Sequence, residues 1–258
     1  MYSRFYSDEY CGIDDSRKSE EGVRKIVRPS PLSSVLRSPF FTILADMIQL
    51  ENVAFQYSPQ SALLQFPDWT VSAGKHAVLL GASGSGKTTL LHLLAGLLRP
   101  TQGKIVIGSQ DIARLRGSAL DRFRGQKLGL VFQQPHLLNS LTLEQNLLLA
   151  QYLAGIKQDR KVIRETLASL SLDHRRTARV TTLSQGEAQR AAIARAVLNK
   201  PVTILADEPT ASLDDPNCER VLELLQNQAS AHGATLLIVT HDQRVKDHIS
   251  QQLTLTPA

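Results

Sequence analysis

The chain of 258 residues has few cysteines and no long hydrophobic run. Its two cysteines, Cys11 and Cys218, can form one disulfide at most, which excludes a heavily cross-linked secreted scaffold and favours a reducing compartment. The longest apolar run, residues 90–98, is shorter than the roughly 20 residues of a transmembrane helix. Charged residues within 17–25 occupy the place where a secretory signal would have its apolar segment. We therefore expect a chain that does not cross a membrane by itself.

The charge of the chain selects no partner. A formal net charge of +5 is too small to indicate nucleic acid, and we expect no nucleic-acid partner. One cluster of basic residues is visible in the sequence, with Asp121 as the single acidic residue between its members: Arg114, Arg116, Arg122, Arg124 and Lys127. Such a cluster is compatible with an anionic lipid surface and equally with a solvated helix face.

Residues 1–46 differ in composition from the rest of the chain. Seven basic and seven acidic residues balance in this segment, and few of its residues could contribute to a core. Met47, the second of two methionines, directly precedes the first strand pattern. Two explanations stay open: residues 1–46 form a disordered extension, or translation begins at Met47. In either case we assign residues 47–258 to one domain.

The pattern from residue 48 onward predicts an α/β fold. Short runs rich in Val, Ile and Leu alternate with longer amphipathic stretches, as in a sheet covered by helices. The strand candidates are 77–80, 104–107, 128–132, 203–206 and 235–239. Their continuous apolar character is typical of the buried strands of a mostly parallel sheet. Between residues 137 and 183 the spacing becomes helical, which predicts a helical insertion in the sheet.

One motif in this pattern indicates phosphate binding. The segment Gly81-Ala82-Ser83-Gly84-Ser85-Gly86-Lys87-Thr88 matches G-x-x-x-x-G-K-[ST] and lies between an apolar strand and a helical run at 89–98 that begins with Thr89. Glycines let the backbone amides approach phosphate oxygens, and the helix N-terminus adds partial positive charge. Lys87 is expected to contact the terminal phosphates, and the Thr88 hydroxyl to bind Mg²⁺.

Two acidic residues follow another buried strand. Asp207 and Glu208 come after residues 203–206, and the carboxyl end of a parallel strand lies at the same sheet edge as the phosphate loop. We predict that Asp207 holds Mg²⁺ and that Glu208 is the general base for water attack on a γ-phosphate.

Together these motifs resemble the ATP-binding cassette (ABC) proteins. Leu183-Ser184-Gln185-Gly186-Glu187, upstream of the acidic pair, is similar to the signature motif of that family. The other motifs follow the family order: Gln133 resembles the Q-loop, Ser212-Leu213-Asp214 the D-loop, His241 the switch histidine and Tyr57 the aromatic residue that stacks on adenine. The resemblance covers residues 48–242. It implies a P-loop NTPase fold, with a RecA-like parallel core, an antiparallel β region and an inserted α-helical subdomain at about 134–183.

The resemblance also implies roles for single residues. Gln133 is expected to contact Mg²⁺ or the attacking water, and His241 the γ-phosphate; with Glu208 they form the catalytic set. Ser184 and Gly186 begin a helix whose N-terminus is suited to bind an anion. In the family this anion is the γ-phosphate of another subunit's ATP. A second ATP-binding subunit is therefore implied, most simply a homodimer. Gln185 stands where the family usually has glycine, and we expect this to slow turnover or alter dimer closure.

A finer resemblance concerns the transported substrate. The segments 128–133, 136–138 and 141–146 are similar to the group that serves lipoprotein release and macrolide export. This resemblance implies a separate integral-membrane permease and a peripheral position on the cytoplasmic face of the inner or plasma membrane. Two alternatives stay open: a subunit of an amino-acid importer, and a soluble ABC ATPase of an assembly such as iron–sulfur scaffold machinery.

Overall fold

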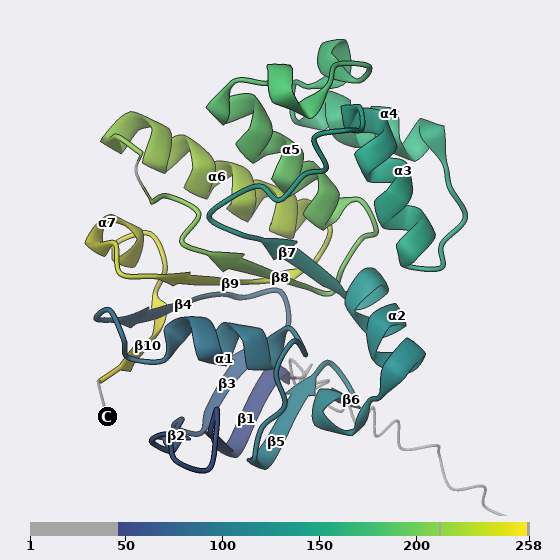
Figure 1. Ribbon diagram of the computed structural model, residues 1–258. Coiled ribbons are helices and arrows are strands. Elements are labelled where there is room, and N and C mark those ends of the chain that lie inside the picture. The colour runs from purple at the N-terminus through teal and green to yellow at the C-terminus, as the bar shows by residue number, and fades with distance from the viewer. Residues whose placement is uncertain (1–45, 212, 257–258) are drawn as a thin grey trace, which may run out of the picture. The chain divides into compact units, whose positions relative to one another are not determined.

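The computed structural model describes residues 46–211 and 213–256 (Figure 1). The expectation for residues 1–46, apart from the backbone of Asp46, lies outside the described residues, as does Ser212. Two sheets make up the β-structure of the described part. None of the helices within this part has both the length and the apolar character that a membrane span requires.

The first sheet is antiparallel. Strand β1 (Asp46–Phe55) pairs with β2 (Leu64–Gln65), β3 (Trp69–Ser72) and β5 (Gln102–Ile107), and β5 pairs with β6 (Gln110–Asp111). The prediction that residues 104–107 belong to the parallel sheet is therefore wrong. Ile105, Val106 and Ile107 are all buried, so this strand has the same continuous apolar pattern as a parallel one. Its partner, β1, lies far away in the sequence, and local pattern does not reveal that pairing.

The second sheet is parallel, in the order β10 (Gln251–Leu255), β4 (His76–Gly81), β9 (Thr235–Thr240), β8 (Thr203–Asp207) and β7 (Leu128–Val131). The four predicted strands β4, β7, β8 and β9 are confirmed to within one residue at each end. Strand β10 was not predicted. It lies at the sheet edge and contains Gln251, Gln252 and Thr254, so it lacks an apolar run.

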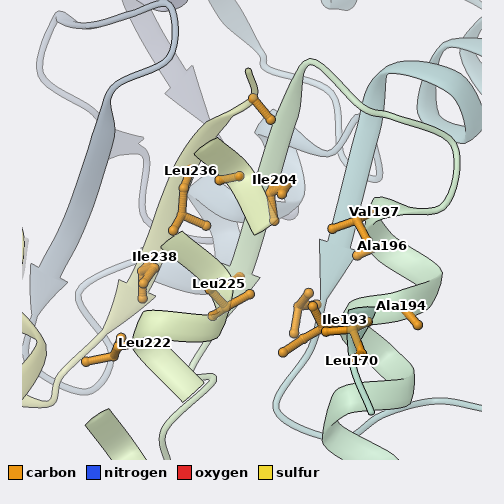
Figure 2. Packing of buried hydrophobic residues seen from close by; sticks show 14 of the residues in the cluster. Leu170, Ile193, Ala194, Ala196, Val197, Ile204, Leu222, Leu225, Leu236 and Ile238 are labelled. Atoms are coloured by element: carbon orange, nitrogen blue, oxygen red, sulfur yellow. The ribbon is translucent and has the colours of Figure 1, made fainter. Parts of the chain in front are cut away.

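Alternate side chains of the parallel strands enter two hydrophobic cores. In β9, Leu237 and Val239 belong to the core that contains α1 (Lys87–Leu94) and the antiparallel sheet. Leu236 and Ile238 belong to the other core, with α5 (Gln185–Val197) and α6 (Asp215–Ala231). Figure 2 shows how residues of α5 and α6 approach β8 and β9 in this second core. Figure 1 shows α1 between the two sheets, with α5 and α6 on the opposite face of the parallel sheet.

A helical insertion separates β7 from β8, as predicted. It contains α3 (Leu143–Leu153), α4 (Arg160–Ser169) and the 3₁₀ turns Asp173–Arg175 and Val180–Thr182. Thr142 forms a capping box with Gln145 at the start of α3, and Asp159 caps α4. Leu147, Ile163 and Leu167 are fully buried and join the core that contains α5. The insertion is thus packed onto the same core as the parallel sheet.

Two further helices lie outside the insertion, one before β7 and one between the last two strands. Helix α2 (Gly117–Lys127) follows a 3₁₀ turn (Ile112–Arg114), and it has no buried residue. Helix α7 (Gln243–Lys246) lies between β9 and β10. Helix α1 ends at Leu94, four residues before the end of the predicted run 89–98. Ala95 is its C-cap, and the next residue, Gly96, adopts a left-handed conformation (φ 65°) that stops the helix.

Candidate functional site

The site lies at the carboxyl ends of four neighbouring parallel strands. The phosphate loop follows β4, His241 follows β9, Asp207 and Glu208 end and follow β8, and Gln133 follows β7. In the sheet β4 is adjacent to β9, β9 to β8 and β8 to β7. Because all four strands run in the same direction, these residues meet at one edge of the sheet.

The phosphate loop joins β4 to α1 through two left-handed glycines. Gly84 has φ 79°, and Gly86, the N-cap of α1, has φ 91°. A side chain at either position would be strained. A Cβ atom at Gly86 would also lie 3.4 Å from the ring of Phe66. The first turn of α1 presents unpaired backbone amides toward this loop, which is the geometry of an anion site.

Lys87 lies over the loop that it follows. Its ammonium donates hydrogen bonds to the carbonyl oxygens of Gly81 (2.8 Å) and Ala82 (2.9 Å), and the residue is 8% exposed. An ammonium has three N–H donors, so the third can reach a phosphate oxygen. The side chain is held in place by the backbone of the loop that is predicted to cradle the phosphates.

Tyr57 contacts the start of α1. Its hydroxyl is 2.9 Å from the Thr89 hydroxyl, and its ring makes an edge-to-face contact with Phe55 at 4.7 Å. The residue is 62% exposed. An exposed aromatic ring fixed beside the phosphate loop is suited to stack on a base.

Glu208 is held by the end of strand β9. Its carboxylate accepts hydrogen bonds from the Thr240 hydroxyl (2.7 Å), from the backbone amide of His241 (3.2 Å) and from Nδ1 of the same histidine (2.8 Å). The backbone of Glu208 has φ 47°, a conformation that costs a non-glycine residue on the order of 1–2 kcal/mol. Strain of this kind is common where a side chain must be aimed at a reacting group.

Asp207 provides the test of whether a metal fits. Its Oδ1 atom is buried and has no hydrogen-bond partner among the described residues. Burial, followed by the neighbouring Glu208 carboxylate, raises the pKa of Asp207 above its ordinary value. A cation would supply the missing partner and reverse that shift. The predicted ligands Thr88, Gln133 and Asp207 each have a side-chain oxygen, the kind of ligand that suits Mg²⁺.

A pocket of about 690 Å³ brings most of the predicted residues together. The predicted residues in its wall are Tyr57, Ser83, Gly84, Gly86, Lys87, Thr88, Thr89, Gln133, Glu208 and His241. Gly81, Ala82, Ser85 and Asp207 belong to the same strand ends but are not in this wall. Ser61, Ala62, Leu64 and Ala211 line the pocket and were not predicted. Three of them are apolar and none lies in a sequence motif, so only the fold could reveal them.

The signature segment lies apart from this pocket. Gly186 and Gln185 line a neighbouring cavity of about 480 Å³, which shares Gln133 and Ala211 with the first. Ser184 caps α5: its hydroxyl accepts from the Glu187 amide (3.3 Å), and Glu187 accepts from the Ser184 amide (2.8 Å). The second bond, above all, holds the pKa of the Glu187 carboxyl below its ordinary value.

Gln185 is compatible with the local backbone. It is the first residue of α5 and is exposed, and it is not among the residues with positive φ. The backbone at this position therefore does not require glycine, and the effect of Gln185 on turnover or dimer closure stays a prediction. The side chain itself still projects at the surface where the second subunit's ATP was predicted.

The basic cluster is partly neutralised by its own neighbours. Arg114 pairs with Asp111 (3.0 Å), and Arg124 pairs with Asp121 and donates to the Gly96 carbonyl (3.1 Å). Arg116 donates to the carbonyls of Ala113 and Leu115. Two of the five basic side chains thus have an acidic partner, which reduces the charge that the cluster offers to a lipid surface.

Sequence reasoning missed the support of the site. Thr240 holds the Glu208 carboxylate, and Asp242 with Arg244 contacts the segment before α6. Thr240 lies one residue beyond the predicted strand 235–239 and was not predicted as a site residue. Its hydroxyl becomes informative once β8 and β9 are known to be neighbours.

Comparison with known proteins gives one family. Residues 64–211 match the family model for the ABC transporter. The dimeric structure of MJ0796, a bacterial ABC transporter cassette, is 32% identical over 82% of this chain and 95% of that chain, with a TM-score of 0.73. A post-hydrolysis dimer of the same cassette with ADP and Pi has 32% identity over 81% and 94%, with a TM-score of 0.70.

A third structure is CbiO1 from Clostridium perfringens, part of the ABC transporter complex cbiONQ. It is 26% identical over 81% of this chain and 84% of that chain, with a TM-score of 0.73. The family model covers more than half of the chain, and the architecture, the phosphate loop and the acidic pair agree with it. The chain belongs to the ABC transporter family and is an ATP-hydrolysing cassette of that family.

Proposed function

We propose that this cassette binds MgATP in the 690 Å³ pocket, dimerises around two ATP molecules and drives a separate membrane permease. The observation that carries the proposal is that Lys87, Gln133, Glu208 and His241, each of which follows one of four neighbouring strands, line one pocket. Each side chain supplies a group that phosphoryl transfer requires: a cation, a ligand for metal or water, a base and a γ-phosphate contact.

The residues of the pocket divide the work. Tyr57 stacks on adenine, and the loop 81–88 with Thr89 holds the phosphates by backbone amides and the Lys87 ammonium. Thr88, Gln133 and Asp207 hold Mg²⁺, which, when bound, neutralises charge on the phosphate oxygens. The Glu208 carboxylate accepts the proton of the attacking water, and His241 contacts the γ-phosphate.

The signature segment serves the second ATP site. Ser184 and Gly186 open a helix of 13 residues, long enough to carry a substantial dipole. The capping bond uses a lone pair of the Ser184 hydroxyl, so its proton can still be donated to a phosphate of the partner. Ser184 and Gly186 line no part of the 690 Å³ pocket. Their position supports a second ATP site that is completed by another copy of this chain or by a similar subunit.

The helical insertion offers a surface for the permease. Leu138 is 49% exposed, yet its backbone is held by both ends of the Asn146 carboxamide, at 2.8 and 3.2 Å. Tyr152 and Leu153, at the end of α3, are also exposed. Exposed apolar side chains on the insertion, one of them only five residues after Gln133, are suited to contact a helix of a membrane protein. On the resemblance stated above, we place the permease in the lipoprotein-release or exporter group and the cassette on the cytoplasmic membrane face.

The direct test is an ATPase assay with purified protein, with and without Mg²⁺. We expect hydrolysis to require Mg²⁺. When a chelator removes the metal ion, we expect the protein to bind nucleotide still, with lower affinity. Absence of hydrolysis by both the isolated protein and the protein in its native membranes would contradict the proposal.

The partner is tested by affinity purification from detergent-solubilised membranes. We expect a membrane-embedded subunit to copurify with the wild-type chain, and less of it with Leu138→Glu. The exposed Gln145→Glu is the matched control, since it adds the same charge at a position on α3. Recovery with soluble partners alone would overturn the transporter proposal and favour the soluble assembly.

A further inference from the structure

Arg244 connects two segments that the family resemblance treats separately. It lies in the four-residue helix α7, directly after the segment that carries His241. Its Nη1 atom donates to the carbonyl oxygen of Leu213 (3.2 Å) and to the Asp215 carboxylate (2.6 Å). Leu213 lies just before α6 and Asp215 is the first residue of that helix, and Figure 1 shows α7 on the side of the molecule where α6 begins. The Arg244 guanidinium thus joins α7 to residues that lie 29 and 31 positions earlier in the chain.

The same guanidinium is anchored on Asp242. Nε donates to both carboxylate oxygens of Asp242 (3.0 and 3.1 Å), and Nη2 donates to Oδ2 at 2.7 Å. The Asp242 side chain is only 14% exposed, and it also accepts a hydrogen bond from the buried Thr210 hydroxyl (3.1 Å). These bonds lower the pKa of Asp242 and raise that of Arg244, so both groups stay charged at neutral pH.

The network continues to the candidate catalytic base. The Asp242 amide donates to the Thr240 hydroxyl (3.0 Å), and that hydroxyl donates to Glu208 (2.7 Å). A continuous series of hydrogen bonds therefore runs from Glu208 through Thr240 and Asp242 to Arg244, and from there to the backbone of Leu213.

Capping of α7 does not explain these contacts. Asp242 already caps the helix by accepting from the Arg244 backbone amide (3.0 Å). The bonds from the Arg244 side chain to Leu213 and Asp215 add nothing to that cap. They require a planar group with several donors, which lysine does not offer.

We propose that Arg244 is a positioning residue that locks residues 213–215 to the segment 240–242, so that displacement of one segment moves His241 and the support of Glu208. The inference rests on the proposed function, in which residues 213–214 belong to the D-loop and ATP is hydrolysed in a dimer. Arg244 touches neither nucleotide nor water in this role. It makes the geometry of the ATP site depend on the position of residues 213–215.

The test compares Arg244→Ala, Arg244→Lys and Lys246→Ala. Lys246 is exposed, lies on the same helix and carries the same charge, so its substitution is the matched control. We expect Arg244→Ala to lower kcat about tenfold, with less than about a twofold change in KM for ATP, because coupling residues act at this scale. Arg244→Lys should have a kcat between those of Arg244→Ala and the wild type. A lysine can keep the ion pair with Asp242 but cannot reach Asp242, Leu213 and Asp215 together. Lys246→Ala should match the wild type.

Hydrogen exchange of the nucleotide-free protein supplies the second readout. We expect amides in both 210–215 and 240–243 to exchange faster in Arg244→Ala, and to remain as in wild type in Lys246→Ala. Faster exchange confined to α7, with kcat within about twofold of wild type, would overturn the inference. A wild-type protein without ATPase activity would instead refute the proposed function, and exchange would still decide whether Arg244 locks the two segments.

Discussion

Nδ1 of His241 lies 2.8 Å from Oε1 of Glu208, so the two residues predicted to act on the γ-phosphate and on water are in direct contact. Because an ionised carboxylate can only accept, the proton in this contact belongs to Nδ1. The two residues follow neighbouring strands, β9 and β8. The Thr240 hydroxyl donates to the other oxygen of the same carboxylate, Oε2. Glu208 is therefore oriented before nucleotide binds.

Replacement of Glu208 by glutamine should separate binding from hydrolysis. Glutamine keeps the size of the side chain and can still accept from Thr240, but it has no charge to take a proton from water. We expect kcat to fall about 10²–10⁴-fold with ATP affinity nearly unchanged. Because hydrolysis no longer reopens the dimer, size-exclusion chromatography with ATP should show a stable dimer.

The matched control for that substitution is Glu223→Gln, because Glu223 is exposed on helix α6 and lies outside the pocket wall. It should hydrolyse ATP as the wild type does. A Glu208→Gln variant that remains monomeric with ATP would contradict the dimer mechanism.

Lys87→Ala should weaken nucleotide binding. The ammonium donates to two carbonyl oxygens of the loop and has one donor left for phosphate. Among the described residues of the pocket wall, Lys87 is the only lysine or arginine. We expect ATP affinity to fall by at least about tenfold, in line with the loss of a charged hydrogen bond. Isothermal titration with ATP measures this, and Lys75→Ala, an exposed lysine before β4, is the control. Equal affinities in the two variants would exclude the predicted role.

Gln185→Gly should act on dimer closure with little effect on the fold. Gln185 is exposed at the first position of α5, where glycine costs at most about 1 kcal/mol of stability. Removal of the side chain should allow closer approach of the second subunit's ATP. We therefore expect turnover and ATP-dependent dimerisation to rise, measured by steady-state hydrolysis and by light scattering. Unchanged values for both would show that the departure from the family motif has no consequence.

The Asp242–Arg244 pair should contribute stability that depends on pH. The bonds from Arg244 hold the folded-state pKa of Asp242 below the unfolded value of about 3.9. The contribution is therefore complete above that value and is lost as the pH falls through the folded pKa. In urea unfolding, wild type should exceed Asp242→Asn in free energy of unfolding at about pH 6, and the difference should shrink at about pH 3. A difference that does not change with pH would contradict this assignment.

Local sequence determined the chemistry of this chain and most of its parallel sheet. The motif 81–88 needs consecutive residues alone, because a strand, two left-handed glycines and a helix N-terminus make a phosphate loop in one short segment. The acidic pair and His241 follow apolar runs that could be read directly. The family resemblance rests on the order of such short segments.

Tertiary structure decided what these segments contact. Strand β5 has the apolar pattern of a parallel strand but pairs antiparallel with β1, and β10 has no apolar pattern yet pairs with β4. The contact of Glu208 with His241 and the bonds from Arg244 to Leu213 join residues about 30 positions apart. Sequence order does not encode strand order in a sheet, and it is the order β4, β9, β8, β7 that places the base beside the histidine.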